Sequence, residues 1–290
     1  MGIQDWKYSG NFLEVEGIKI YFRDSGGPKP VLCILHGYPT SSYDYQHLLP
    51  ELSENFRVIL HDQAGFGLSG KPINYGYQLK DQAKIALKLW ERLGVNKAHI
   101  MAHDYGTSVA TEIMALRLDG YNSIEFESLT LCNGSVHIEL SQLRTIQKLL
   151  KHPLLGSLVA LVSNRNTFRR NMRNIWYDDS GLTNQQLDLM WELLTVNHGK
   201  RVLPKITRYI DQRYEFYDRW IGALKKTDLP SHILWAKNDP VAVIDIAYAL
   251  KEDIPHAKLT ILDNLGHYPM IEDPVRWKKC LMDFYQNLNS

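Results

Sequence analysis

The chain has 290 residues, of which 44% are hydrophobic, and its formal net charge is +1 at pH 7. This length is enough to bury a large core, either in one large domain or in a core that carries an insertion. The balanced charge, without long runs of one sign, argues against nucleic acid or another polyanion as a partner.

The cysteines and the N-terminus indicate the compartment. The chain has an odd number of cysteines, and two of the three (Cys33 and Cys132, but not Cys280) lie in apolar strand-like runs. A disulfide framework is therefore not expected, and a reducing compartment is. Residues 1–7 lack the apolar core of a signal peptide, and no apolar run approaches the length of a membrane span. We expect a cytoplasmic protein with no membrane span, either a monomer or a homodimer.

Eight segments are predicted to form β-strands. The first two alternate apolar and polar residues around Glu16-Gly17, which predicts a hairpin. The other six are mostly continuous apolar runs, as expected for parallel strands covered on both faces. In chain order the segments are Phe12–Val15, Lys19–Phe22, Val31–Leu35, Arg57–Leu60, Ala98–Met101, Ser128–Leu131, His232–Trp235 and Lys258–Leu262.

Amphipathic segments lie between several of these strands. Residues Gln78–Leu93 place apolar side chains on one face and precede Gly94, so they predict a helix that ends at a glycine. After the sixth strand the alternation stops, and helix-like stretches recur at Ser141–Lys151, Asn184–Val196 and Val202–Arg219. A helical insertion explains this change of pattern.

The predicted fold class is therefore α/β, with an eight-stranded, mostly parallel sheet, helices on both faces and an inserted helical cap. We expect a core in two parts, 1–134 and 226–290, around a cap at 135–225. The cap carries a basic cluster, which we interpret as a solvated helix face because aromatic residues do not interleave with it regularly. Its members are Arg165, Arg169, Arg170 and Arg173.

The most informative candidate for a functional residue is Asp104, between an apolar strand and a helical stretch at 107–118. Small residues, Ala102 and Gly106, lie two positions away on either side, as required by a tight strand-to-helix turn that presents a nucleophile. A carboxylate there is ionised at neutral pH and suits displacement at a saturated carbon, whereas a serine would perform acyl transfer. The alternative is that Asp104 only caps the helix that begins near Tyr105.

Two later residues are candidates for its partners. Asp239 and His267 each follow an apolar strand, and open α/β sheets build their sites at the carboxyl ends of strands. The chain order nucleophile, acid, histidine is one of the known orders of a catalytic triad. Taken singly, Asp239 could be a turn residue before Pro240, and His267 could be one of many packed histidines. Their common order with Asp104 favours the triad.

A turn after the third strand supplies candidate hydrogen-bond donors. The sequence His36-Gly37-Tyr38-Pro39 can offer a backbone N–H that joins the N–H of the residue after the nucleophile. We predict an oxyanion hole made by the N–H groups of Tyr38 and Tyr105. We expect His36 to brace the turn rather than to transfer protons.

Five motifs carry a resemblance to a known family: His36-Gly-Tyr-Pro39, Asp62-x-x-Gly-Phe-Gly-x-Ser69, His103-Asp-Tyr-Gly106, Asn238-Asp-Pro240, and Gly266-His-Tyr-Pro269 with Glu272-Asp-Pro274. Together they resemble the epoxide hydrolase and haloalkane dehalogenase branch of the α/β-hydrolases. Within that branch the chain looks most like the mesoderm-specific transcript proteins, through residues 36–44 and the cap segments 209–213 and 219–224. The resemblance spans about residues 12–285.

The resemblance implies one of two reactions. Haloalkane dehalogenases typically hold the leaving halide with an Asn after His-Gly and a Trp after the nucleophile, where this chain has Tyr38 and Tyr105. Epoxide hydrolases use cap tyrosines that donate to the ring oxygen. Tyr209, 21 positions before Pro230, matches the expected place of one of them. The resemblance therefore favours epoxide opening.

The second cap tyrosine of the epoxide hydrolases does not appear near residues 143–152. Tyr38, Trp176 and Tyr177 are the candidates to replace it in substrate binding. We accordingly assign catalytic roles to Asp104 and its two partners, and a proton-donor role to Tyr209.

We thus expect a hydrolase that forms an alkyl ester on Asp104, first an epoxide hydrolase that gives a diol, with haloalkane dehalogenation as the alternative. The partners would be a small apolar epoxide or haloalkane and water, with no metal and no organic cofactor. A ligand-binding protein that keeps the fold is a further alternative, which the complete triad argues against. Acyl hydrolysis is disfavoured because attack of a carboxylate on an ester would give an anhydride.

Overall fold

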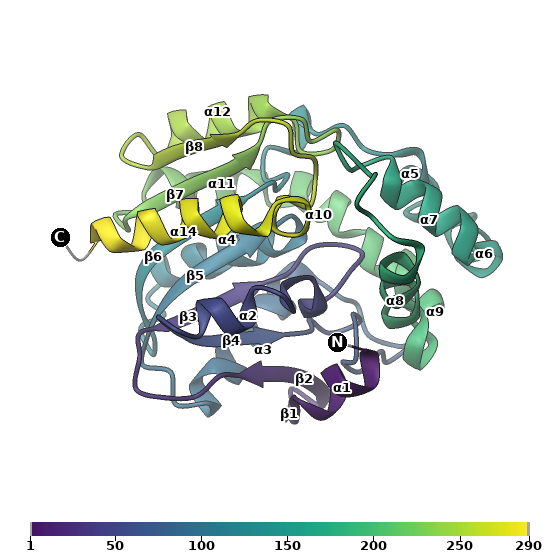
Figure 1. The fold of residues 1–290 in the computed structure, drawn as a ribbon, viewed down its shortest axis with the longest axis horizontal. Helices are drawn as coiled ribbons and strands as arrows, with labels where there is room; N and C mark the ends of the chain where they lie inside the picture. Colours follow the sequence, from purple (N-terminus) through teal and green to yellow (C-terminus); the bar gives the residue numbers. More distant parts are fainter. Residues whose placement is uncertain (1, 289–290) are drawn as a thin grey trace.

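The computed structural model describes residues 2–288 and contains one eight-stranded sheet (Figure 1). The strands lie in the order β1-β2-β4-β3-β5-β6-β7-β8. The pairs β1–β2 and β2–β4 are antiparallel, and the remaining pairs are parallel. All eight expected strands are confirmed: β1 (Asn11–Val15), β2 (Ile18–Asp24), β3 (Val31–Leu35), β4 (Arg57–His61), β5 (Lys97–His103), β6 (Glu125–Cys132), β7 (Ser231–Ala236) and β8 (Lys258–Leu262).

Helices cover both faces of the sheet, which explains why its central strands are continuous apolar runs. In Figure 1, α2 and α14 lie in front of the sheet, and α3 and α4 lie behind it. The core helices are α1 (Ile3–Tyr8), the 3₁₀ turn η1 (Ser42–Tyr45), α2 (Leu49–Leu52), α3 (Leu79–Arg92), α4 (Tyr105–Leu118), α12 (Ile244–Asp253), α13 (Pro269–Glu272) and α14 (Pro274–Leu288).

The expected helical insertion lies between β6 and β7, and we call it the cap. Its residues 145–207 occupy the right-hand side of Figure 1, and its last two helices return to the middle of the picture. No helix in the described part of the chain is both long enough and apolar enough to cross a bilayer. The cap consists of η2 (Ile138–Leu140), α5 (Thr145–Leu150), α6 (Gly156–Val162), α7 (Arg165–Arg173), α8 (Asn184–Thr195), η3 (Val196–His198), α9 (Gly199–Thr207), α10 (Tyr209–Glu215) and α11 (Tyr217–Lys225).

Two cap helices differ from their expected extents. The helix expected at Ser141–Lys151 covers only Thr145–Leu150, because the preceding segment is tied to the core by the bond from Gln142 N–H to Val241 C=O (2.9 Å). The helix expected at Val202–Arg219 is divided into α9, α10 and α11. The two breaks redirect the chain from α6, on which α9 packs, to α4, on which α11 packs.

A buried carboxylate joins the end of the cap to the core. Glu112 of α4 accepts two hydrogen bonds from the Arg219 guanidinium of α11, both at 3.0 Å, and one from the indole N–H of Trp220 at 2.7 Å. Glu112 and Trp220 are buried, and Arg219 is partly exposed. Arg219 also reaches Asp119 at the surface. The contact fixes α11 on α4.

We expect Glu112→Ala to lower the free energy of unfolding by about 2–4 kcal/mol, because it leaves the buried Trp220 N–H and the Arg219 charge without their acceptor. Urea unfolding followed by circular dichroism measures this loss. Asp119→Ala removes only the exposed partner of Arg219 and should cost less than about 1 kcal/mol. Equal losses for both variants would contradict the role of Glu112.

Candidate active site

Asp104 lies in a strained turn between β5 and α4. Its φ is 45° and its ψ is −108°, in a region that non-glycine residues rarely adopt. The first turn of α4 needs a glycine at position 106, because a Cβ there would lie 2.4 Å from the Leu35 carbonyl oxygen. The turn therefore presents the Asp104 side chain at the carboxyl ends of β3 and β5, as the sequence predicts.

The Asp104 carboxylate is buried, and its two oxygens have different surroundings. Oδ1 accepts a 2.7 Å hydrogen bond from the Tyr38 backbone N–H. Oδ2 lies 3.8 Å from Nε2 of His267, too far for a direct hydrogen bond. Asp104 is the N-cap residue of α4 by position, but its side chain makes no capping bond to that helix and is directed to Tyr38 and His267 instead.

His267 and Asp239 form the pair that the sequence predicts. His267 Nδ1 lies 2.7 Å from Asp239 Oδ2, and both side chains are buried. Asp239 Oδ1 accepts from the backbone N–H groups of Val241 (2.7 Å) and Ala242 (3.0 Å). Asp239 thus shapes the turn after β7 and also orients the imidazole, with Nε2 directed to Asp104.

The charges around His267 favour its protonated form. Burial alone would lower the pKa of His267, but the Asp239 carboxylate and its hydrogen bond, together with Asp104, raise that pKa to about 9. The two carboxylates therefore favour the imidazolium form of His267 in the resting site. Loss of the Asp104 charge removes part of this stabilisation and makes the imidazole easier to deprotonate.

Asn133 is a site residue that the sequence analysis missed. It follows β6 with φ 43°, and its amide donates to Asp239 Oδ2 at 2.8 Å. Its own oxygen accepts from the Ala236 N–H at 2.9 Å, which fixes the orientation of the amide. The only signal available was its place directly after an apolar strand.

The loop that carries His267 is held by both the core and the cap. The Glu272 carboxylate accepts from the N–H groups of Gly266 (2.9 Å), Tyr268 (3.2 Å) and the cap residue Tyr177 (3.0 Å). The N–H of His267 itself donates to the carbonyl of Ile175 at 2.9 Å. The backbone of the cap between α7 and α8 therefore helps to fix the position of His267.

The structure places Trp176 and Tyr177 outside the cavity lining. Trp176 stacks on Tyr268, with ring centroids 4.8 Å apart, and the Tyr177 side chain is half exposed. Both residues contact the histidine loop rather than the space above Asp104.

Two further histidines of the motifs are buried supports. His36 Nε2 accepts from the Gln63 N–H at 3.0 Å, and Nδ1 lies 2.8 Å from the Gly37 carbonyl, as expected for a residue that braces the turn. His103 Nε2 lies 2.8 Å from the His267 carbonyl. Burial lowers the pKa of His103 to about 4, so this ring is a neutral donor to the histidine loop.

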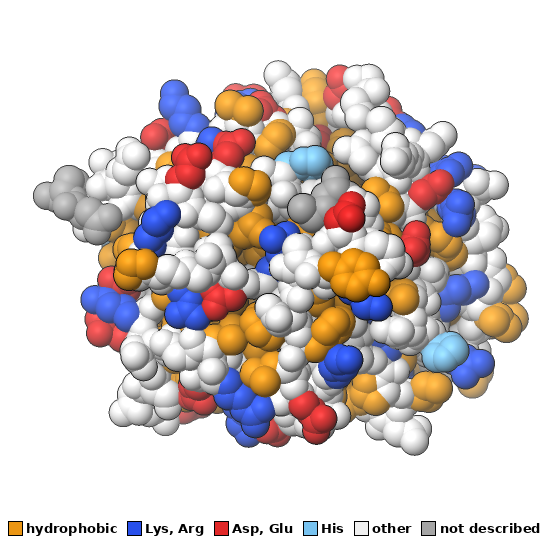
Figure 2. Space-filling view, turned by 60° about the horizontal axis from the view of Figure 1, so that its bottom comes forward, with side chains coloured by type: hydrophobic (Ala, Val, Ile, Leu, Met, Phe, Trp, Pro, Cys, Tyr) orange, Lys and Arg blue, Asp and Glu red, His pale blue; other side chains and the backbone are white. Residues whose placement is uncertain are grey.

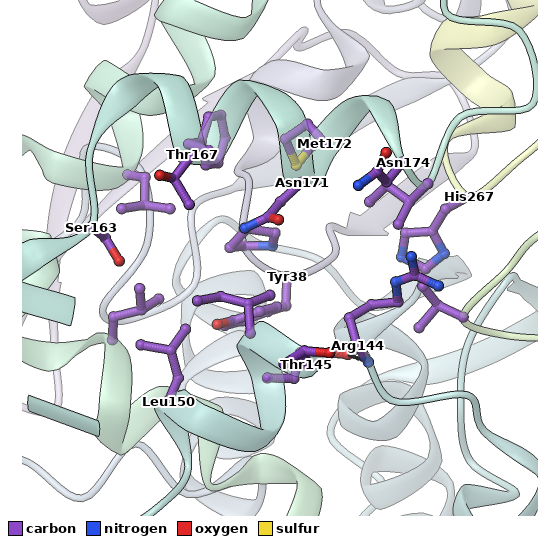
Figure 3. A pocket seen from close by; sticks show the side chains of 18 of the residues that line it. Tyr38, Arg144, Thr145, Leu150, Ser163, Thr167, Asn171, Met172, Asn174 and His267 are labelled. Carbon is purple, nitrogen blue, oxygen red and sulfur yellow. Dashed lines mark hydrogen bonds between the residues drawn. The ribbon is translucent and has the colours of Figure 1, made fainter. Parts of the chain in front are cut away.

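A cavity of about 380 Å³ lies between Asp104 and the cap (Figure 3). Its wall mixes apolar side chains of α5, α7, α8 and α9 with polar ones. Several of the polar groups make no side-chain hydrogen bond within residues 2–288 and are free to bind a ligand; they include Arg144, Asn171 and Asn174. The lining comprises Tyr38, Pro39, Asp104, Leu143, Arg144, Thr145, Ile146, Gln147, Leu150, Ser163, Thr167, Phe168, Asn171, Met172, Asn174, Ile175, Trp191, Leu194, Leu203, Val241 and His267.

Tyr209 lies just behind this lining. It is buried, and its ring contacts those of Tyr38 and Tyr105, with centroids 5.3 and 5.2 Å apart. Its hydroxyl oxygen accepts from Gln147 Nε2 at 3.0 Å. The orientation of the Gln147 amide is fixed, because its Oε1 accepts a hydrogen bond from the Arg144 N–H at 2.8 Å. Exchange of the amide oxygen and nitrogen would lose this bond. Gln147 lies in the part of α5 where the epoxide hydrolases have their second tyrosine, and no sequence pattern indicates its contact with Tyr209.

The two tyrosines near Asp104 differ in whether their protons are free. Thr207 donates its hydroxyl proton to Leu203 C=O, so the Tyr38 hydroxyl, 2.9 Å from Thr207 Oγ1, must be the donor in that pair. Tyr209 receives a bond and keeps its own proton free. Burial, and then the Asp104 charge, hold the pKa of Tyr209 well above its ordinary value, so the proton is present at neutral pH.

Arg213 attaches the cap to the nucleophile turn. Its guanidinium is buried, donates to Ser108 Oγ at 2.8 Å and to the Asp104 carbonyl at 3.2 Å, and lies 4.6 Å from the centroid of the Tyr209 ring. Arg213 is the last residue of the cap segment 209–213, which carries part of the family resemblance.

The sheet order, the inserted cap and the nucleophile-acid-histidine arrangement define a class of protein. The chain belongs to the α/β-hydrolase fold family, whose model matches residues 30–274. It is 36% identical over 272 residues to the "Putative hydrolase LipZ" of Mycobacterium tuberculosis, which covers 94% of each chain.

Two other similarities are informative. The chain is 32% identical over 293 residues to the mesoderm-specific transcript protein of Mus musculus, across 97% of this chain and 87% of that one. The solved structure of the epoxide hydrolase CorEH superposes with a TM-score of 0.77 at 19% identity, across 96% of this chain and 99% of that one, which shows a common fold.

The Asp239 charge raises the pKa of His267, so Asp239→Asn should lower it, and the imidazole resonances of His267 in an NMR titration should move at a lower pH. Asp245→Asn, at an exposed position of α12, is the matched control and should leave the His267 titration unchanged. A His267 titration that is the same in Asp239→Asn and the parent would show that the charge of Asp239 does not control it.

Proposed function

We propose that this hydrolase opens epoxides to diols through an alkyl ester on Asp104. The proposal rests on a buried carboxylate at the cavity together with Tyr209, whose hydroxyl accepts from Gln147 of the cavity wall and keeps its own proton free. A carboxylate forms a stable ester by attack on a saturated carbon, and an epoxide carbon also requires a proton for its departing oxygen.

In the first step Asp104 Oδ2 attacks a ring carbon of the epoxide. A bond forms between Oδ2 and that carbon, and the carbon–oxygen bond of the ring breaks toward the oxygen. Tyr209 supplies the proton to this oxygen and is later reprotonated from solvent. Oδ1 stays on the Tyr38 N–H and becomes the carbonyl oxygen of the ester.

In the second step neutral His267 takes a proton from a water molecule, which attacks Cγ of Asp104. The negative charge gathers on Oδ1, which already accepts from the Tyr38 N–H, and we propose the Tyr105 N–H as the second donor. Collapse breaks the bond between Cγ and the ester oxygen of the product. That oxygen takes the proton of the hydroxyl that water left on Cγ, which restores the carboxylate and releases the diol, while His267 keeps the proton taken from water. Esterification has removed the Asp104 charge, so the pKa of His267 is lower in the intermediate, and hydrolysis should speed up as pH rises through that pKa.

Dehalogenation is the competing reaction on the same ester. A halide leaves as a stable anion and needs only hydrogen-bond donors. Tyr38 offers a hydroxyl already engaged with Thr207, in the position where dehalogenases typically have an Asn. The available proton on Tyr209 therefore supports epoxide opening over loss of a halide.

His267→Gln should alkylate but fail to hydrolyse, because only the second step needs a base. We expect a stoichiometric mass increase on intact protein after incubation with a panel of epoxides and haloalkanes. Asp104→Asn is the blank and should gain no mass. A single turnover of the parent in heavy-oxygen water should leave the label in Asp104 and out of the product.

Label in the first-turnover product would instead show direct attack by water and remove the nucleophile role of Asp104. A panel on which neither turnover nor alkylation is detected, with ligand binding intact, would favour the ligand-binding alternative.

Tyr209→Phe should reduce epoxide turnover by about 10²–10⁴-fold, the usual effect of losing a general acid, while haloalkane turnover changes far less. Steady-state rates on both substrate classes measure the difference. Tyr38→Phe is the matched control: its hydroxyl proton is engaged with Thr207, so its loss of epoxide turnover should be much smaller. Equal losses on both substrate classes would show that Tyr209 acts through packing.

A further inference from the structure

Helix α6 and the turn before it expose a row of large aliphatic side chains, which we call the apolar ridge: Leu154, Leu155, Leu158, Leu161 and Val162. The exposed fractions are 84% for Leu154, 58% for Leu158, 71% for Leu161 and 64% for Val162. Positions three and four residues apart share a helix face, so these side chains form one surface. α6 lies at the outer tip of the cap (Figure 1). Contiguous apolar surface of this kind marks a contact site.

The inner face of α6 explains why the large side chains point outward. Gly156 and Ala160 are the buried residues of this helix. A Cβ on Gly156 would lie 2.2 Å from the Leu150 carbonyl oxygen, so α6 approaches α5 too closely for a larger residue. The helix buries its small residues and exposes its leucines, the reverse of an ordinary surface helix.

The surroundings of the ridge are basic. Residues 141–177 contain seven Lys and Arg and no Asp or Glu. Helix α9, which packs on α6, adds Lys200, Arg201 and Lys205, also without an acidic residue. Hydrophobic and basic side chains adjoin at the right-hand edge of Figure 2, the side on which α6 lies.

Acidic residues of other elements neutralise only part of this charge. Lys151 pairs with Asp211, Arg165 and Arg169 both pair with Asp188, and Arg173 pairs with Asp179. Lys148, Arg170 and Arg201 make no ion pair within residues 2–288. An apolar surface with free cations at its border complements a layer that is apolar inside and anionic at its surface.

We propose that the apolar ridge inserts into the interface of a bilayer that contains anionic lipids, so that the protein binds membranes peripherally through its cap. A second copy of the chain fits the surface less well, because two ridges face to face would bring two basic borders together. The helices before and after α6 line the cavity, with Leu150 from α5 and Phe168 from α7. Membrane contact thus places the cavity beside an apolar phase. This inference does not depend on the proposed reaction.

Sedimentation of the full chain with vesicles tests the proposal without any activity measurement. We expect binding to phosphatidylcholine vesicles that contain phosphatidylglycerol, weaker binding to phosphatidylcholine alone, and release at high salt. The double substitution Leu158→Asp with Leu161→Asp should reduce binding roughly tenfold or more. Lys148→Glu should weaken binding to the anionic vesicles only.

Val275→Asp and Lys279→Glu are the matched controls, since both residues are exposed on α14, away from the cap, and these variants should bind like the parent. All the substituted side chains are exposed, and an unchanged melting temperature confirms that the variants are folded. Absence of binding by a folded parent would overturn the proposal, as would equal losses in the α14 variants. A ridge variant that lowers the oligomeric mass of the free protein, with vesicle binding unchanged, would assign the ridge to self-association instead.

Discussion

The left-handed backbone of Asp104 is the constraint on which the rest of the site depends. A non-glycine residue in such a conformation costs about 1–3 kcal/mol and persists only where its surroundings enforce it. Here the Asp104 N–H donates to the Cys132 carbonyl at 3.1 Å, and the Asp104 carbonyl accepts from Thr107 Oγ1 at 2.6 Å and from Arg213. β6, α4 and the cap thus hold the turn from three sides.

In the proposed mechanism this arrangement makes the cap a part of the active site rather than a cover. Arg213 bonds to the backbone of the nucleophile, and Gln147 orients the hydroxyl of Tyr209. The cap is itself anchored through Arg219 to the buried Glu112 of α4, the helix that begins at the nucleophile turn. The core helix α4 therefore positions both the Asp104 turn and the end of the cap, so their relative positions are fixed.

The sequence predicted what depends on local patterns. Period and composition identified all eight strands, and the small residues around Asp104 indicated the turn, because strand burial and turn sterics act over a few neighbouring residues. Contacts between residues far apart in the sequence produce no such local pattern. Asn133 and Gln147 act through single amides whose partners lie 106 and 62 positions away, and neither residue type marks its role. The breaks between α9, α10 and α11 were missed because the helices they pack on belong to other parts of the chain.

The attachment of the histidine loop to cap backbone has a consequence for recombination between relatives. The Ile175 carbonyl and the Tyr177 N–H hold the loop through main-chain atoms, so almost any side chain at these two positions preserves the contact. A cap transplanted from another member of the family need not match their identities. It must place main chain at the same distance from Gly266. This distance is short, since a Cβ on Gly266 would lie 2.5 Å from the Tyr177 nitrogen. Loop length between α7 and α8, rather than residue similarity, therefore limits which caps are interchangeable.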